Sequence, residues 1–153
     1  MRWLEHRIPP PVVLAAFAAG AVLSARLWPA ASMRFPGREV VAGLLAAAGI
    51  GVIAAGILQF RRSRTTVNPL KPEAASALVD EGVFGWTRNP MYLGMALGLA
   101  AVAIWLGNAG GAILLVGFIA YITRFQIVPE ERALRANFGE AFDAYAARVR
   151  RWI

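Results

Sequence analysis

The sequence predicts an all-α integral membrane protein, with four transmembrane helices and a C-terminal amphipathic helix at the membrane interface. The 153-residue chain is 58% hydrophobic and only 16% charged, and its mean hydropathy of +0.54 is high for a soluble protein. Four apolar stretches are long enough to cross a hydrocarbon core. They cover residues 11–28, 40–60, 91–106 and 110–128. We expect one domain, residues 1–153.

The first stretch has an alternative interpretation. A basic start, an apolar run and the small residues of LSAR also occur in secretory signal peptides. The run is long for a signal core, so we expect a transmembrane helix. His6 has no partner ligands nearby in the sequence and is expected at the surface. The chain has no cysteine and no metal-ligand spacing, so we expect no metal site.

Small residues recur at helical spacing in the second and third stretches. They are Gly43, Ala47, Gly51 and Ala55 in the second, and Gly94 and Gly98 in the third. Such spacing lets membrane helices approach closely, and we expect the first set to pack against another helix. The second set directly follows a polar segment, so it either packs against a helix or lets a ligand approach the backbone.

The basic residues predict the orientation. Thirteen Lys and Arg residues lie in the N-terminal segment, the 61–90 loop and the C-terminal region, whereas the other three lie near the end of the first stretch or between it and the second. The positive-inside rule therefore places both termini in the cytoplasm, and we expect a bacterial inner membrane. The net charge of +7 is explained by this orientation and by anionic lipids, and it gives no reason to expect nucleic acid. The apolar stretches contain no acidic residue, which argues against an ion-coupled transporter.

The region after the fourth stretch has the periodicity of an amphipathic helix. Apolar side chains recur at three- and four-residue steps, at Leu134, Phe138, Phe142, Tyr145, Val149 and Trp152. We expect a cytoplasmic helix over 130–151 that starts at Pro129 and is divided at Gly139. Glu130 and Glu131 either stabilise the start of this helix or bind a ligand.

A polar segment, TRNP at residues 87–90, precedes the third stretch and faces the same side of the membrane as the glutamate pair. Carboxylates bind an ammonium group, Asn89 offers hydrogen bonds, and aromatic rings such as Tyr92 can face a cation. These residues predict a site for a polar ligand at the cytoplasmic membrane interface.

Two segments, GVFGWTRNPMYLG and PEERALRANFGEAFDAYAARVRR, resemble the C-terminal half of the integral-membrane methyltransferases. That group includes isoprenylcysteine carboxyl methyltransferases and phospholipid N-methyltransferases. Its members carry an Arg-His/Asn-Pro-x-Tyr-x-Gly motif before one membrane helix and a Glu-Glu pair after the next. The resemblance covers about 65–150.

The resemblance implies methyl transfer from S-adenosylmethionine to a lipid or hydrophobic acceptor, as in isoprenylcysteine carboxyl methyltransferases. Phospholipid N-methylation and a non-catalytic four-helix accessory protein are the alternatives. The implied cofactor-binding residues are Asn89, Pro90, Tyr92, Leu93, Gly94, Gly98, Glu130 and Glu131. The implied catalytic residues are Arg124, Glu130, Tyr145 and Arg148.

The chain departs from the group's pattern at several positions. Asn89 replaces the commoner histidine, Phe142 replaces a tyrosine, and Val83 and Phe84 stand where relatives tend to have Pro-Tyr. These departures leave the acceptor open, whether carboxylate, amine or thiol, and the oligomeric state is open as well. The 61–90 loop is either a lid over the cofactor or a plain connection.

Overall fold

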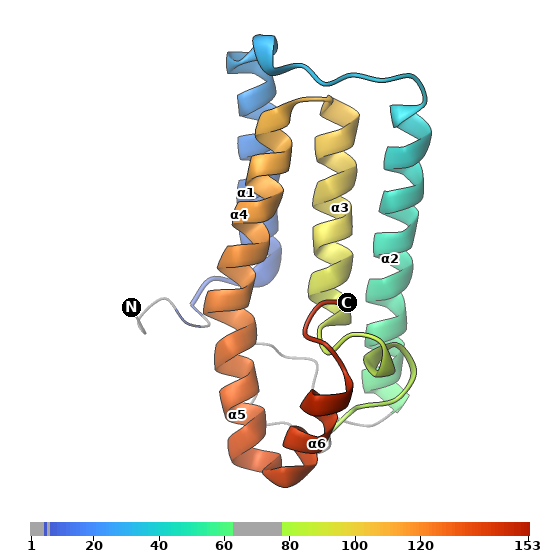
Figure 1. Cartoon of the computed structure of the whole chain (residues 1–153), viewed down its shortest axis with the longest axis vertical. Coiled ribbons are helices and arrows are strands. Elements are labelled where there is room, and N and C mark those ends of the chain that lie inside the picture. The colour runs from blue at the N-terminus through green and yellow to red at the C-terminus, as the bar shows by residue number, and fades with distance from the viewer. Residues whose placement is uncertain (1–4, 6, 63–77) are drawn as a thin grey trace.

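The chain folds into an antiparallel bundle of four long helices, in a computed structural model that describes residue 5, residues 7–62 and residues 78–153. The helices are α1 (Pro10–Leu27), α2 (Arg38–Arg62), α3 (Pro90–Leu106) and α4 (Ala109–Ile122). α3 lies in the middle and packs against the other three, while α1 also packs against α4 (Figure 1). The described part has no β-strand, which confirms the predicted all-α class. Half of the 61–90 loop, residues 63–77, lies outside the described residues, and so does His6.

Three helices are long and apolar enough to span a membrane: α1, α2, and the continuous helix Ala109–Phe138 that contains α4. α3 is apolar and has 17 residues, the short end of the spanning range. The first three predicted stretches agree with the observed helices within two residues at each end. Four helices that cross in alternation bring the start of α1, the end of α2 and the start of α3 to one end of the bundle, together with the C-terminal region (Figure 1).

The opposite end is fixed by a tight turn between α3 and α4. Gly107 adopts a left-handed conformation (φ 59°), which glycine reaches without a steric cost. The Asn108 side chain accepts a hydrogen bond from the Gly110 amide at 2.9 Å, which caps α4. Its amide nitrogen donates to the Trp28 carbonyl at 2.9 Å. One side chain thus joins the start of α4 to the end of α1.

The packing face of α2 differs from the predicted one. The buried small residues of α2 are Ala42, Gly49 and Gly56, seven residues apart. A Cβ atom on Gly43 or Gly51 would meet no atom within 4 Å, so this set does not pack against another helix of the same chain. Two sets of small residues overlap along α2, and the apolar character of the whole helix gave no indication of which one is buried.

The fourth helix does not end where the sequence predicts. α4 continues through a π-helical turn, η5 (Thr123–Ile127), into α5 (Val128–Phe138). The Val128 amide donates to the Thr123 carbonyl five residues back. The wide turn comes just before Pro129, which has no amide hydrogen for an α-helical bond. The predicted helix start at Pro129 is therefore wrong, because the π turn lets the helix pass through the proline.

The C-terminal region is two helices followed by an extended tail. Gly139 (φ 52°) separates α5 from α6 (Glu140–Arg148), which confirms the predicted division. The predicted extension of the helix to residue 151 is wrong, because α6 ends at Arg148. Residues 149–153, called the C-terminal strap below, turn back toward the start of α3 (Figure 1).

Candidate functional site

A carboxylate and a phenol meet between α3 and α5. Tyr92 lies in the first turn of α3, is 5% exposed, and donates a hydrogen bond from its hydroxyl to the Glu130 carboxylate. Among the described residues, Glu130 forms no ion pair with an arginine or lysine. Tyr92 also belongs to the main apolar cluster, with Leu99 and Ile127. The site thus has a carboxylate that is next to apolar surface and has no cationic partner in the described part of the chain.

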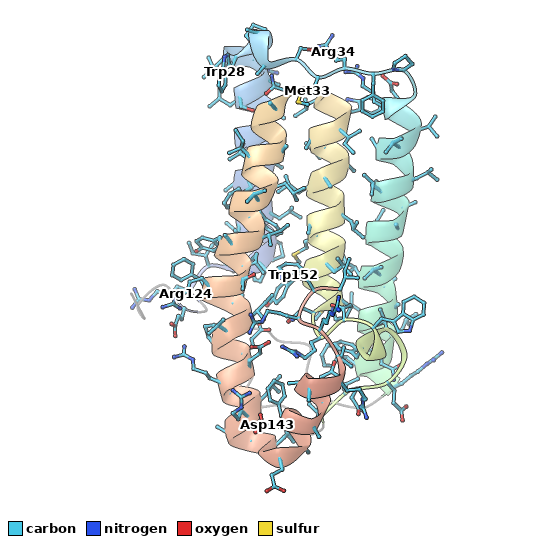
Figure 2. The ribbon with its side chains drawn as sticks, viewed as in Figure 1. Trp28, Met33, Arg34, Arg124, Asp143 and Trp152 are labelled. Carbon is cyan, nitrogen blue, oxygen red and sulfur yellow. The ribbon has the colours of Figure 1, made fainter. Side chains whose placement is uncertain are left out.

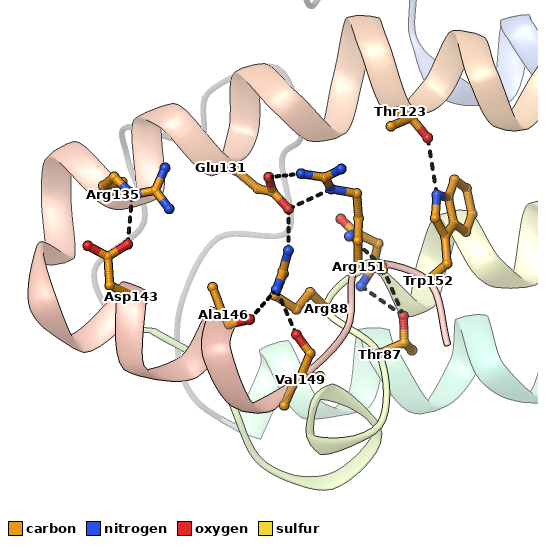
Figure 3. Close-up of polar contacts among 11 residues, drawn as sticks. Thr87, Arg88, Thr123, Glu131, Arg135, Asp143, Ala146, Val149, Arg151 and Trp152 are labelled. Atoms are coloured by element: carbon orange, nitrogen blue, oxygen red, sulfur yellow. Dashed lines mark hydrogen bonds and ion pairs between the residues drawn. The ribbon is translucent and has the colours of Figure 1, made fainter.

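The neighbouring glutamate has the opposite environment (Figure 3). Arg88 donates to Glu131 at 2.8 Å, and Arg151 donates to both oxygens of the same carboxylate, at 2.9 and 2.7 Å. The side chains of Arg88 and Glu131 are 12% and 14% exposed. The hydrogen bond to Glu131 raises the pKa of Arg151 above its usual range. Glu131 is therefore paired with two arginines, whereas Glu130 pairs with no arginine or lysine of the described residues.

Arg88 and Asn89, from the polar segment before α3, bind the chain that follows α6. The Arg88 side chain donates to the carbonyls of Ala146 and Val149, at 2.8 and 2.6 Å, and its amide donates to the Arg150 carbonyl at 3.0 Å. Asn89 Nδ2 donates to the Arg151 carbonyl at 2.8 Å. These contacts hold the C-terminal strap against the start of α3.

Trp152 fastens the same strap to the other side of the site. Its indole nitrogen donates to the Thr123 hydroxyl at 3.1 Å, as Figure 3 shows, and its ring packs against the main apolar cluster. Thr123 begins the π turn η5. Sequence analysis assigned no site role to Arg151 or Trp152. The apolar periodicity had placed Trp152 on the C-terminal helix, where its contact with η5 could not be foreseen.

The structure brings five of the predicted site residues together. Asn89, Pro90 and Tyr92 form the start of α3, and Glu130 and Glu131 stand opposite on α5. Leu93 follows in the same turn of α3 and is partly buried.

The two predicted glycines lie deeper along α3. A Cβ atom on Gly94 would lie 2.5 Å from both the Gly49 carbonyl oxygen and Ile53 Cγ1. Gly94 therefore faces α2, and of the two predicted roles it has the helix-packing one. A Cβ atom on Gly98 would meet nothing within 4 Å.

Two predicted catalytic arginines lie away from the Tyr92–Glu130 contact. Arg124 is on the outer side of η5, 49% exposed, and pairs with Glu5 at 2.9 Å (Figure 2). The hydrogen bond from Arg124 lowers the pKa of Glu5, which also pairs with Arg132. Arg148 is 65% exposed and pairs with Asp80 at 2.8 Å.

Tyr145 joins α6 to the segment before α3. Its hydroxyl donates to the Phe84 carbonyl in η4 (Gly82–Gly85) at 2.8 Å. Burial raises the pKa of the Tyr145 phenol, so the hydroxyl remains a donor. With Phe142 and Val149 it forms a second apolar cluster. In this structure Tyr145 supports the docking of α6 and makes no hydrogen bond to Tyr92 or Glu130.

Comparison with known proteins adds a family. A family model described as phospholipid methyltransferase matches residues 38–141, which is more than half of the chain. An uncharacterized protein of Haemophilus influenzae is 41% identical over 63 residues, which are 41% of this chain and the whole of that protein. No solved structure matches. The matched residues contain Asn89, Tyr92 and both glutamates, whereas α1 and the C-terminal strap lie outside the match.

Proposed function

Because the chain belongs to the phospholipid methyltransferase family, whose members transfer methyl groups at membranes, we propose that it transfers a methyl group from S-adenosylmethionine to a lipid acceptor. The observation that carries this proposal is the contact between Tyr92 and Glu130, 38 positions apart in the chain. This contact holds the Glu130 carboxylate beside the apolar cluster that contains Tyr92. Glu130 pairs with no cationic side chain among the described residues. We propose that this end faces the cytoplasm, because most of the Arg and Lys residues belong to it.

The residues at the site fit the chemistry of the cofactor. S-adenosylmethionine, when bound, supplies an electrophilic methyl group on a sulfonium sulfur, and it also carries an ammonium group and ribose hydroxyls. Glu130 has no cationic partner among the described residues, so its carboxyl is available to pair with the ammonium group, and charge-assisted bonds of this kind are the stronger ones. Tyr92 orients the Glu130 carboxylate through its hydroxyl. Asn89 and Glu131 are further hydrogen-bonding groups at the same end.

The surrounding residues have three tasks in such a reaction. The apolar cluster around Tyr92, which includes Leu99 and Ile127, excludes water from the reacting atoms. The helices hold the acceptor in line with the methyl group, which is the main requirement for a displacement of this kind. For an amine acceptor, Glu130 is also the group that takes the proton lost by the attacking nitrogen. For a carboxylate acceptor no proton is lost and no base is needed.

The proposal is tested with purified protein in detergent. We expect S-adenosylhomocysteine, the demethylated cofactor, to bind with a micromolar dissociation constant in calorimetry. A labelled-methyl assay on a total membrane lipid extract then identifies the acceptor. Label that is stable to base and remains with an ethanolamine headgroup indicates N-methylation, whereas base-labile label indicates a carboxyl ester. If neither cofactor form binds, the chain is a non-catalytic member of its family and the proposal is wrong.

Tyr145→Phe separates a structural role from a catalytic one. The change leaves the Phe84 carbonyl without its donor, and we expect the free energy of unfolding to fall by about 1–3 kcal/mol. Affinity for S-adenosylhomocysteine is expected to stay the same, since the hydroxyl is bound to η4. Thermal melting and calorimetry measure the two quantities. A folded Tyr145→Phe protein that binds the ligand but transfers no methyl group would restore the catalytic assignment.

A further inference from the structure

We propose that residues 151–153 of the C-terminal strap are an autoinhibitory element that closes the cofactor site and must detach before the cofactor binds, while Val149 stays buried in the second apolar cluster. This inference rests on the proposed function. The strap crosses from the start of α3 to α5 and η5, so it touches both sides of the site (Figure 3).

Arg151 occupies the polar groups that a cofactor would need. Its carbonyl accepts a hydrogen bond from Asn89 at 2.8 Å, and its guanidinium binds both oxygens of Glu131. Asn89 and Glu131 stand on opposite sides of the site. A ligand that uses the Asn89 amide or the Glu131 carboxylate therefore competes with one residue, Arg151.

Trp152 holds the strap in place next to Arg151. Its indole donates to Thr123, and its ring packs against the main apolar cluster, which includes Tyr92. Ile153 beyond it is 77% exposed, so the described contacts of the strap end at Trp152. Detachment of Trp152 would uncover the apolar surface beside Tyr92, where a hydrophobic acceptor can bind.

The strap is suited to detach without unfolding the bundle. It has no helical hydrogen bonds of its own beyond residue 149, and the Arg151 side chain is 38% exposed. Partly exposed ion pairs are screened by solvent and exchange readily for other partners. Arg88 would still neutralise Glu131 after Arg151 has left.

Arg151→Gln tests the proposal, because the affinity for S-adenosylhomocysteine should rise if the strap competes with the ligand and fall if the strap is part of the binding site. If the strap competes with the cofactor, the variant binds S-adenosylhomocysteine more tightly, by about tenfold, because a larger fraction of molecules is open. If the strap instead forms part of the site, the affinity falls, and the proposal is overturned. Arg135→Gln is the matched control, since it removes a solvent-exposed ion pair between Arg135 on α5 and Asp143 on α6. Its affinity should equal that of the wild type.

Trp152→Phe provides a second, milder variant in case Arg151→Gln does not fold. It keeps an aromatic ring but removes the hydrogen bond to Thr123 and part of the indole's apolar contact. We expect a smaller rise in affinity with the same sign, and Thr123→Val should reproduce it. An unchanged or reduced affinity in both of these variants would contradict the inference that the contact between Trp152 and Thr123 holds the strap closed.

A labelling experiment observes the strap itself. The chain has no cysteine, so Ile153→Cys can carry a single spin label. We expect the label to become more mobile when S-adenosylhomocysteine is added, and also in the Ile153→Cys/Arg151→Gln double variant without ligand. A label whose mobility changes in neither case rules out detachment. If the wild type binds the ligand and the strap variants behave as the wild type, only the strap proposal fails. If no variant binds it, the proposed function fails and the strap proposal fails with it.

Discussion

Glu130→Gln is expected to weaken the affinity for S-adenosylhomocysteine by about 10- to 100-fold, since a hydrogen bond to a charged group contributes roughly 1.5–3 kcal/mol. Glutamine has the shape of glutamate and can still accept the hydrogen bond from Tyr92. The change therefore removes the carboxyl group that can pair with the ligand's ammonium group and leaves the packing between α3 and α5 intact. Calorimetry measures the affinity, and thermal melting shows whether the fold is unchanged.

Two comparison variants make this result specific to the site. Glu140→Gln removes an exposed carboxylate from the first turn of α6 and should bind the ligand as the wild type does. Tyr92→Phe keeps the Glu130 carboxyl but loses the hydroxyl that orients it, so its loss of affinity should be smaller than that of Glu130→Gln. Equal affinity in Glu130→Gln and the wild type would show that the Glu130 carboxyl does not hold the ligand.

Gly94→Ala is expected to lower the stability of the bundle by about 1–3 kcal/mol, the usual cost of overpacking a core. The added methyl group would lie 2.5 Å from the Gly49 carbonyl oxygen. A backbone oxygen cannot move aside alone, so α2 and α3 must separate. Gly49→Ala should have a similar effect, because its methyl group would lie 2.7 Å from the Gly94 carbonyl oxygen. Unfolding in detergent, followed by circular dichroism, measures the change.

Gly43→Ala and Gly51→Ala are the matched controls on the same helix. No atom lies within 4 Å of the added methyl group at either position. Alanine favours helix over glycine by up to about 1 kcal/mol, so these variants should be as stable as the wild type or slightly more stable. If they lose as much stability as Gly94→Ala, the exposed face of α2 packs against something, such as a second copy of the chain.

Hydrophobicity and helix signals were sufficient to predict the bundle. The apolar stretches gave the first three spans, and Pro90 marked the start of α3. Pro129 carries the same signal and does not start a helix, because a π turn precedes it. A π turn depends on tertiary packing around Thr123–Ile127, which the local sequence does not reveal.

The sequence could predict which residues form the candidate site but not how they pair. The sequence placed two glutamates opposite the Asn89 segment, and the structure has them there. It could not assign them different roles, which follow from their positions on the helix. Neighbouring residues on an α-helix point about 100° apart, so Glu130 reaches Tyr92 while Glu131 reaches Arg88. Arg151 reaches Glu131 because the chain after α6 is extended and turns back toward the start of α3. Apolar periodicity in the sequence does not predict such a turn.

The most direct test of the central claim is a labelled-methyl assay with wild-type protein and Glu130→Gln side by side. Both are reconstituted with membrane lipids and given S-adenosylmethionine that carries a labelled methyl group. The account predicts labelled lipid with the wild type and a loss of nearly all of it with Glu130→Gln at equal amounts of folded protein. Undiminished transfer by Glu130→Gln, or no transfer by the wild type to any lipid fraction, would contradict it.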